Sequence, residues 1–326
     1  DYYASRGLGD VYKRQIKSSM LPVAIIVGAL FYKWIGYLSF LSPYLIFAML
    51  FVTYCRLKPK EFKPHRSQVL ELAIQLGMAA AVYLAILPFS HTVAEGVFIC
   101  VFIPTATAAP VITSMLGGSI SYVATYSLIC NTVIAFAGSA VLALVGDYTA
   151  FGFWESTWLI MCKVFPLLIL PMVCAFLLRY IWPQAHRVIE KSQQLSFYMW
   201  VVALILIVGN CVGFVILHWD ESQLMSLIWM VAGALGVCLL QFTVGRKLGE
   251  YMMRRMQSRG ETVDKDLRVS CAQSLMQKNT VLAIWLAMAY MTPLASVAPA
   301  AYIAWQNILN SWQLFRHESD KVKKIA

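Results

Sequence analysis

The sequence predicts an all-α membrane protein with ten transmembrane helices, arranged as two inverted five-helix repeats. Of its 326 residues, 60% are hydrophobic and 13% are charged, about half the charged fraction of an ordinary soluble domain. Apolar stretches near the roughly 20 residues that a helix needs to cross a bilayer recur along the chain. Two of them, in corresponding places of the two halves, are interrupted by prolines or polar residues. These two breaks predict discontinuous helices that cross.

The ten predicted spans divide into five plus five, in repeats covering residues 16–144 and 145–326. An odd number of spans in each half turns the second half upside down in the membrane, which produces an inverted repeat. Spans four and nine are the broken ones. The predicted spans are 18–37, 41–55, 67–87, 94–116, 119–144, 156–180, 195–217, 224–245, 267–292 and 297–315.

Residues 1–15 are treated separately from the fold. From Ser5 to Gln15 the sequence matches an in-frame translation of a transposase adapter used in sequencing libraries. Such scars are excluded from fold reasoning, so we expect residues 1–15 to be an adapter-derived artefact. The alternative is a basic cytoplasmic leader.

Basic residues indicate the orientation in the membrane. Lys and Arg are counted in short loops, where they favour the cytoplasmic side. Both termini of this multi-pass protein of the plasma (inner) membrane are therefore predicted to be cytoplasmic. The net charge of +10 is interpreted as a topology signal rather than a nucleic-acid surface, with a polybasic patch for an acidic partner as the alternative. The basic connections are 56–66, 179–191, 246–268 and the tail 316–324; those without Lys or Arg are 88–93, 145–155, 218–223 and 293–296.

The sequence carries no motif of an enzyme. Its eight cysteines are scattered through apolar spans without Cys-x-x-Cys spacing, which argues against both a disulfide framework and a zinc site. There is no His-Glu-x-x-His, no Gly-x-Ser-x-Gly and no phosphate-binding glycine loop. We expect no catalytic residue, no cofactor other than a coupling sodium ion or proton, and no obligate protein partner.

The first break lies between Pro104 and Pro110. Pro104 interrupts the helical ladder, whereas Pro110 suits the first turn of a new half-helix, where its missing N–H costs nothing. Thr105 and Thr107 supply hydroxyls, and Gly117 can end the half-helix with a positive φ. The N-terminus of a half-helix favours an anionic ligand. The alternative is a proline-kinked helix in which threonines bond to their own backbone.

The second break contains Ser274, Gln277, Lys278, Asn279 and Thr280 within an otherwise apolar segment. Asn279 or Thr280 can cap the following half-helix. A lysine in the middle of a membrane helix is costly and normally faces a cavity or a partner. We expect Lys278 to meet carbonyl ends of upstream half-helices or a substrate carboxylate; the alternative is a lysine that reaches the membrane interface.

These segments resemble the bile acid:sodium symporter superfamily. The similarity is carried by residues 104–118, 276–283 and 304–312, and by helix order over 18–315. The resemblance implies a ten-helix fold in which helices one, two, six and seven form a panel and the others a core with crossing helices. It also implies transport of organic anions such as steroid conjugates or small carboxylates, often driven by sodium.

The chain departs from that family pattern at the ion site. Sodium-coupled members have a Glu where this chain has Ser274 (or Gln273), and a Ser-Asn pair where it has residues 109–110. The Gln that follows is replaced by Lys278, whereas Gln75 and Ser127 match ion-site positions. Hard cations prefer oxygen ligands and little competing charge. Our hypothesis is that the Lys278 ammonium takes the space of a bound sodium ion, which makes transport sodium-independent or coupled to protons.

The sequence thus predicts a secondary transporter of organic anions that works by alternating access. The alternatives are a sodium-coupled symporter of the same fold, a non-transporting receptor for such ligands, and a channel. The candidate substrate-binding residues are Thr105, Thr107, Pro110, Lys278, Asn279 and Thr280. The candidate ion or coupling residues are Gln75, Ser127, Ser274, Gln277 and Lys278.

Other polar residues in the predicted spans are expected to meet water or to support packing between helices. Glu71 is expected to meet Arg66 or water near the cytoplasmic end of its helix, and His91 and Glu95 to form a solvated outer rim, with a gate or proton relay as the alternative. The amides of Asn131, Gln306, Asn307 and Asn310 are expected to join helices by hydrogen bonds.

Overall fold

The computed structural model describes residues 20, 23–24, 26–55, 64, 66–106, 108–145, 153–217, 224–260 and 266–323. Residues 1–15 and Thr107 lie outside this part of the chain. Within it the protein is all-helical, and the only extended pairing is an isolated antiparallel bridge between Thr105 and Lys278. The predicted all-α class is confirmed.

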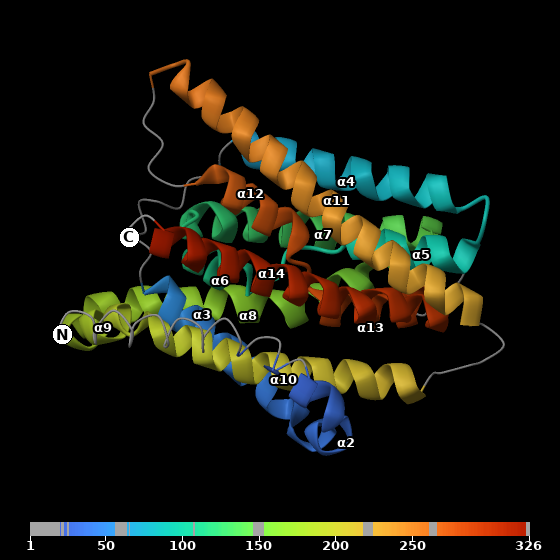
Figure 1. The fold of residues 1–326 in the computed structure, drawn as a ribbon, viewed down its shortest axis with the longest axis horizontal. Helices are drawn as coiled ribbons and strands as arrows, with labels where there is room; N and C mark the ends of the chain where they lie inside the picture. Colours follow the sequence, from blue (N-terminus) through green and yellow to red (C-terminus); the bar gives the residue numbers. More distant parts are fainter. Residues whose placement is uncertain are drawn as a thin grey trace.

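The helices form two layers. The first layer lies at the bottom of Figure 1, where α3 packs against both α8 and α10, and α2 packs against α10. A short helix, α9, follows α8 at one end. The bounds are α2 Tyr32–Ile35, the 3-10 helix η1 Gly36–Leu41, α3 Ser42–Tyr54, α8 Phe153–Ile181, α9 Pro183–Lys191 and α10 Gln193–Leu217.

The second layer contains both broken segments. The outer helices α4 and α11 cover it. Helices α5, α12 and α14 pack against α11, and α13 packs against α5 and α14 (Figure 1). The bounds are α4 Arg66–Ile86, α5 His91–Phe102, α6 Ala109–Met115, α7 Ile120–Val145, α11 Leu224–Gln257, α12 Leu267–Met276, α13 Thr280–Tyr290, the 3-10 helix η4 Pro293–Ser296 and α14 Val297–Lys323.

A continuous apolar core holds the second layer together around the breaks. It includes Val97–Ile103 of α5, Leu275 and Met276 of α12, and Leu286 of α13. Small residues bring two of its helices close together: a Cβ on Gly245 of α11 would meet the backbone of Ala272 in α12 at 2.6 Å. Such close approach is typical of helix pairs in membranes.

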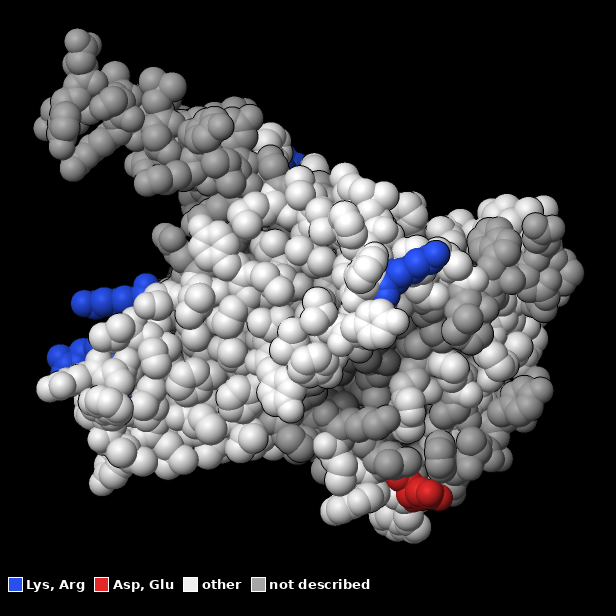
Figure 2. Space-filling model, turned by 90° about the horizontal axis from the view of Figure 1, so that it is seen from below, with Lys and Arg blue, Asp and Glu red and all other residues white. Residues whose placement is uncertain are grey.

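Three helices of the described residues are long and apolar enough to cross a membrane: Arg66–Ile86, Ile120–Gly138 and Leu224–Gln257. Shorter apolar helices accompany them, among them His91–Phe102. Among the described residues on the face of the first layer, most are uncharged: Lys or Arg show at the left end, at the upper edge and at the upper right, and an acidic group shows at the lower right (Figure 2). The predicted spanning helices are thus confirmed in part, and the count of ten stays a prediction.

Two connections differ from those predicted. The helix predicted to end at residue 245 continues to Gln257, so Arg246, Lys247, Arg254 and Arg255 lie on α11 rather than in a loop. The polar segment after α8 forms the additional helix α9. The prediction used apolar runs alone, and a polar helix that extends beyond the membrane leaves no apolar signal.

Candidate functional site

The two breaks cross each other in extended conformation. Thr105 and Lys278 form an antiparallel bridge, in which the Ala106 N–H donates to Gln277 O at 2.9 Å and the Asn279 N–H donates to Pro104 O at 3.0 Å. The backbone groups that leave the helical ladders are thereby paired with each other. This pairing solves the problem that an interrupted helix meets in an apolar environment.

Side chains from the first half satisfy the last carbonyls of α5. Gln75 of α4 donates its amide to Phe102 O at 3.1 Å and Ile103 O at 3.0 Å. The Tyr126 hydroxyl of α7 donates to Gln75 Oε1 at 2.7 Å. Gln75 thus lies at the break, as predicted, but its side-chain oxygen already accepts a hydrogen bond.

A similar arrangement satisfies the end of α12 in the second half. The Tyr302 hydroxyl of α14 donates to Met276 O at 2.7 Å, and Gln241 Nε2 of α11 donates to the Tyr302 hydroxyl at 2.9 Å. Thr105 also donates to Ser274 O at 2.7 Å. A Gln from the outer helix and a Tyr from the last helix therefore serve the break in each half. Sequence analysis missed Tyr126, Gln241 and Tyr302, because a Tyr or Gln in an apolar helix gives no sign of what it faces.

Two half-helices begin at the crossing. Pro110 is buried in the first turn of α6, as predicted. The Asn279 side chain accepts the Leu282 N–H at 3.2 Å and caps α13, as predicted, while Thr280 follows as a buried residue. The half-helix α6 ends with Gly117 at φ 81°, as expected. Helix N-termini carry partial positive charge, and α13 thus directs it at the crossing.

The Lys278 side chain is buried inside the protein, within electrostatic reach of groups on three helices of the first half. It is 1% exposed, and its Nζ has no hydrogen-bond partner among the described residues. The titratable groups that interact electrostatically with the Lys278 ammonium are Cys130 of α7, Glu71 of α4 and Cys100 of α5. Cys130 Sγ in turn lies 3.7 Å from Gln75 Oε1. The expected contacts of the ammonium with carbonyl ends are absent, because other side chains already serve those carbonyls.

Glu71 was expected to meet Arg66 or water, and the structure shows that this was wrong. Its side chain is completely buried and accepts the Tyr122 hydroxyl at 2.9 Å on Oε2, and Ser274 lies beside it. Oε1 has no hydrogen-bond partner among the described residues. The helical face that carries Glu71 and Gln75, one turn apart, points into the core. A carboxyl therefore lies at Ser274 although α12 supplies none.

The remaining candidates for the ion site form local hydrogen bonds. Asn131 donates to Ser127 O at 2.7 Å, and more weakly to Thr105 O at 3.4 Å. The Ser274 hydroxyl donates to Ser270 O, and Gln277 Nε2 donates to Gln273 Oε1. The structure thus brings Gln75, Ser127, Ser274, Gln277 and Lys278 to the crossing region.

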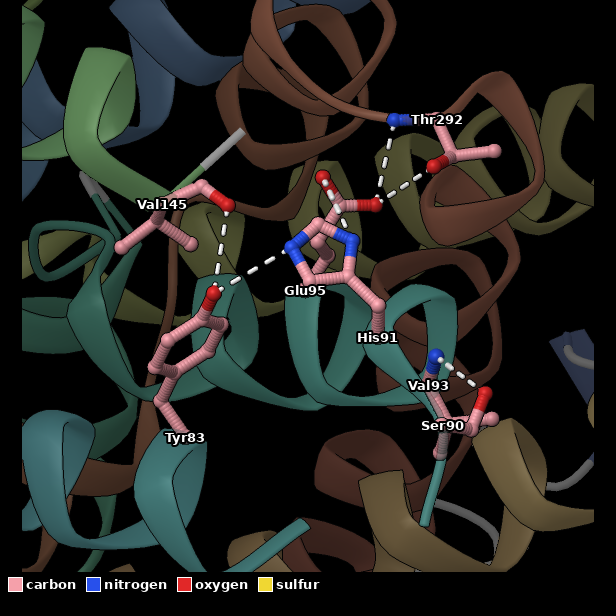
Figure 3. A network of polar contacts seen from close by, with 7 residues as sticks. All are labelled: Tyr83, Ser90, His91, Val93, Glu95, Val145 and Thr292. Carbon is pink, nitrogen blue, oxygen red and sulfur yellow. Dashed lines mark hydrogen bonds and ion pairs between the residues drawn. The ribbon is translucent and has the colours of Figure 1, made fainter. Parts of the chain in front are cut away.

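A second polar network lies at the N-terminal end of α5, away from the crossing (Figure 3). Glu95 is completely buried, so the expected solvated rim was wrong for this residue. It accepts the Thr292 N–H at 3.2 Å and the Thr292 hydroxyl at 2.7 Å. His91 Nδ1 lies 3.9 Å from Glu95, and His91 Nε2 lies 3.3 Å from the Tyr83 hydroxyl. The network joins α4 and α5 to the end of α13.

Asp266 begins α12 at the opposite end from the crossing. Its carboxylate accepts the N–H groups of Arg268 and Val269, and it forms an ion pair with the Arg268 side chain at 2.8 Å. Burial raises the pKa of Asp266, but the hydrogen bonds and charge of Arg268 outweigh burial and hold that pKa below its usual value. The carboxylate thus stays charged at the helix N-terminus, where a negative charge is favourable.

Neither a protein-family model nor a curated protein matches this chain.

Proposed function

We propose that this protein is a secondary transporter of organic anions that works by alternating access without a bound sodium ion. The proposal is carried by one observation: the paired crossing of two broken helices with the buried ammonium of Lys278 beside it. Interrupted helices that cross at the middle of a membrane are the usual ligand site of such transporters.

The electrostatics of the four half-helix ends support an anionic substrate and an internal cation. The C-terminal ends of α5 and α12 meet at the crossing, and each carries partial negative charge. This partial charge favours a nearby cation even without direct contact, and Lys278 follows the end of α12 directly. The N-terminal ends of α6 and α13 favour negative charge and would hold the carboxylate or sulfonate of the substrate.

The groups around Lys278 support its role in place of sodium. The Lys278 ammonium interacts electrostatically with Cys130, which lies near Gln75, and with Glu71 and Cys100. Gln75 Oε1 accepts a hydrogen bond from Tyr126, and Asn131 donates to both the carbonyl and the hydroxyl of Ser127. Glu71 supplies a carboxyl in the same region, which offsets the charge of Lys278. We therefore assign Lys278 to the coupling region rather than to the substrate.

The paired Gln and Tyr side chains support the inverted repeat. Gln75 and Tyr126 serve the first break from α4 and α7, and Gln241 and Tyr302 serve the second from α11 and α14. In a five-plus-five count these are the third and fifth helices of each half. We propose ten spans with cytoplasmic termini, in which the first layer is the panel and the second layer is the core that rocks against it.

The test is uptake of labelled taurocholate into proteoliposomes, with sodium, potassium and proton gradients imposed separately. We expect saturable uptake without sodium, and its loss in Lys278→Ala. Exposed Lys247 on α11 provides a matched control, and Lys247→Ala should keep the uptake. Uptake that requires sodium would contradict the role of Lys278 and favour the sodium-coupled alternative.

Two further outcomes would contradict transport itself. Flux without saturation or counterflow would indicate a channel, and ligand binding without flux would indicate a receptor.

A further inference from the structure

A row of amide side chains connects α12 and α14 on one side of the crossing. Gln277 Nε2 donates to Gln273 Oε1 at 3.1 Å, and Gln273 Nε2 donates to Gln313 Oε1 at 3.1 Å. At the other end of the row, Gln306 Oε1 accepts the Lys278 N–H at 3.1 Å. Asn310 lies on the same face of α14 as Gln306 and Gln313, since residues four and three apart are neighbours on a helix.

Asn310 is the exception within this row. Its side chain is completely buried, yet neither Nδ2 nor Oδ1 has a hydrogen-bond partner among the described residues, and Nε2 of Gln313 also has none. Asn310 was expected to join helices, and it does not. Asn307 bonds within its own helix, donating to Ile303 O at 2.7 Å. A buried amide without partners is unfavourable for folding, so its presence needs a reason.

The position of Asn310 supplies that reason. Ile303 and Leu314, seven residues before it and four residues after it, pack into an apolar cluster with Val111 of α6 and Leu204 of α10. Asn310 therefore lies where the amide row meets the boundary between the two layers. Under the proposed function, this boundary opens when the core moves against the panel.

We propose that Asn310, together with Gln313, is a substrate subsite that binds an uncharged hydrogen-bonding group. This subsite rests on the proposed transport function and deepens it. An amide with a free donor and a free acceptor complements a hydroxyl group, which also donates and accepts. Asn310 lies one turn, about 6 Å along the helix, beyond Gln306 at the crossing. The substrate is then an organic anion that carries a hydroxyl about that far or farther from its charge.

Taurocholate and taurocholanate, the taurine conjugate of 5β-cholanoic acid, provide matched probes, because they share the charged tail and taurocholanate has no ring hydroxyl. The variants are Asn310→Leu, which keeps the shape without the amide, and the control Asn307→Leu. We expect Asn310→Leu to weaken taurocholate binding by about tenfold or more, to leave taurocholanate binding unchanged, and to melt at or above the wild-type temperature without ligand. Asn307→Leu should melt lower and keep the preference for taurocholate.

Both the melting and the binding measurements have an outcome that would contradict the proposed subsite. A lower melting temperature of Asn310→Leu shows that its amide has a structural partner, and this measurement needs no ligand. Equal binding of both probes by the wild-type protein overturns the subsite but leaves transport standing. If neither probe is taken up by the wild-type protein, the proposed function fails for bile acids, while the melting comparison still decides the subsite.

Discussion

The two breaks meet in one bridge but differ in chemistry. The first begins its half-helix α6 after Ala108, which offers no side-chain cap, and carries no charged residue in its described part. The second begins α13 after the capping Asn279 and carries Lys278. The amide row also belongs to the second break, through Gln273 and Gln277 of α12.

This difference indicates that the two halves contribute different chemical groups to the crossing. The first half supplies neutral support and the buried carboxyl of Glu71, whereas the second half supplies the positive charge and most polar groups. The crossing itself is made by backbone hydrogen bonds, so the side chains of the two halves can differ while the crossing persists. We expect loss of the charge of Lys278 to alter transport most, and loss of the supporting side chains, Gln75 above all, to alter stability most.

The largest expected effect is that of Lys278→Gln, which removes the internal cation but keeps a polar side chain. Sodium-free uptake should fall by about tenfold or more, equivalent to at least about 1.4 kcal/mol. Sodium should restore part of it, because the α5 and α12 ends still favour a cation. The measurement is taurocholate uptake with and without sodium, and unchanged sodium-free uptake would refute the role of Lys278.

The two supporting glutamines should differ in their effect on stability. Gln75→Leu leaves Phe102 O, Ile103 O and the Tyr126 hydroxyl unpaired. Gln241→Leu removes only the weak hydrogen bond to Cys100 O at 3.4 Å from that end of α5, and the Tyr302 hydroxyl still donates to Met276 O. Each buried group left unpaired costs about 1–3 kcal/mol. Gln75→Leu should therefore be the more destabilising variant by that amount or more, measured by unfolding in detergent. Equal losses would contradict the asymmetry.

Asn279→Ala should cost about 1 kcal/mol, because it removes the cap of α13. The matched change in the first break, Ala108→Ser, should alter stability little. Ala108 has φ −77° and ψ −13°, outside the extended conformation that capping residues adopt. The free energy of unfolding of both variants in detergent tests this comparison. A clear increase in stability from Ala108→Ser would show that a side chain at position 108 can cap α6.

The smallest effect concerns Asp266, far from both breaks. Its lowered pKa stabilises the folded state above the ordinary Asp pKa of about 3.9, and this contribution is lost as pH falls through the folded-state value. Asn caps a helix as well as Asp, so Asp266→Asn removes the charge alone. We expect a loss of about 0.3–1 kcal/mol at pH 7 that disappears in acid. A loss that persists at low pH would exclude the charge as its cause.

Local conformation at the breaks could be predicted from particular residues. Pro110 in the first turn of α6, the cap by Asn279 and the positive φ of Gly117 all follow from the backbone preferences of single residue types. The partners of Gln75 and Glu71 could not be predicted. Both residues have polar side chains on an apolar helix, and their surroundings come from α5 and α7, which are distant in sequence.

The sequence by itself determined that the chain is helical, that it contains membrane-spanning lengths, and where two helices break, since hydropathy and the preferences of Pro, Gly and Asn act over a few residues. Only the tertiary structure decided that the breaks pair with each other, that Lys278 is buried within electrostatic reach of Cys130 and Glu71, and that Asn310 is buried without a partner among the described residues. These contacts join residues far apart in sequence, and a side chain's burial depends on all the helices packed around it.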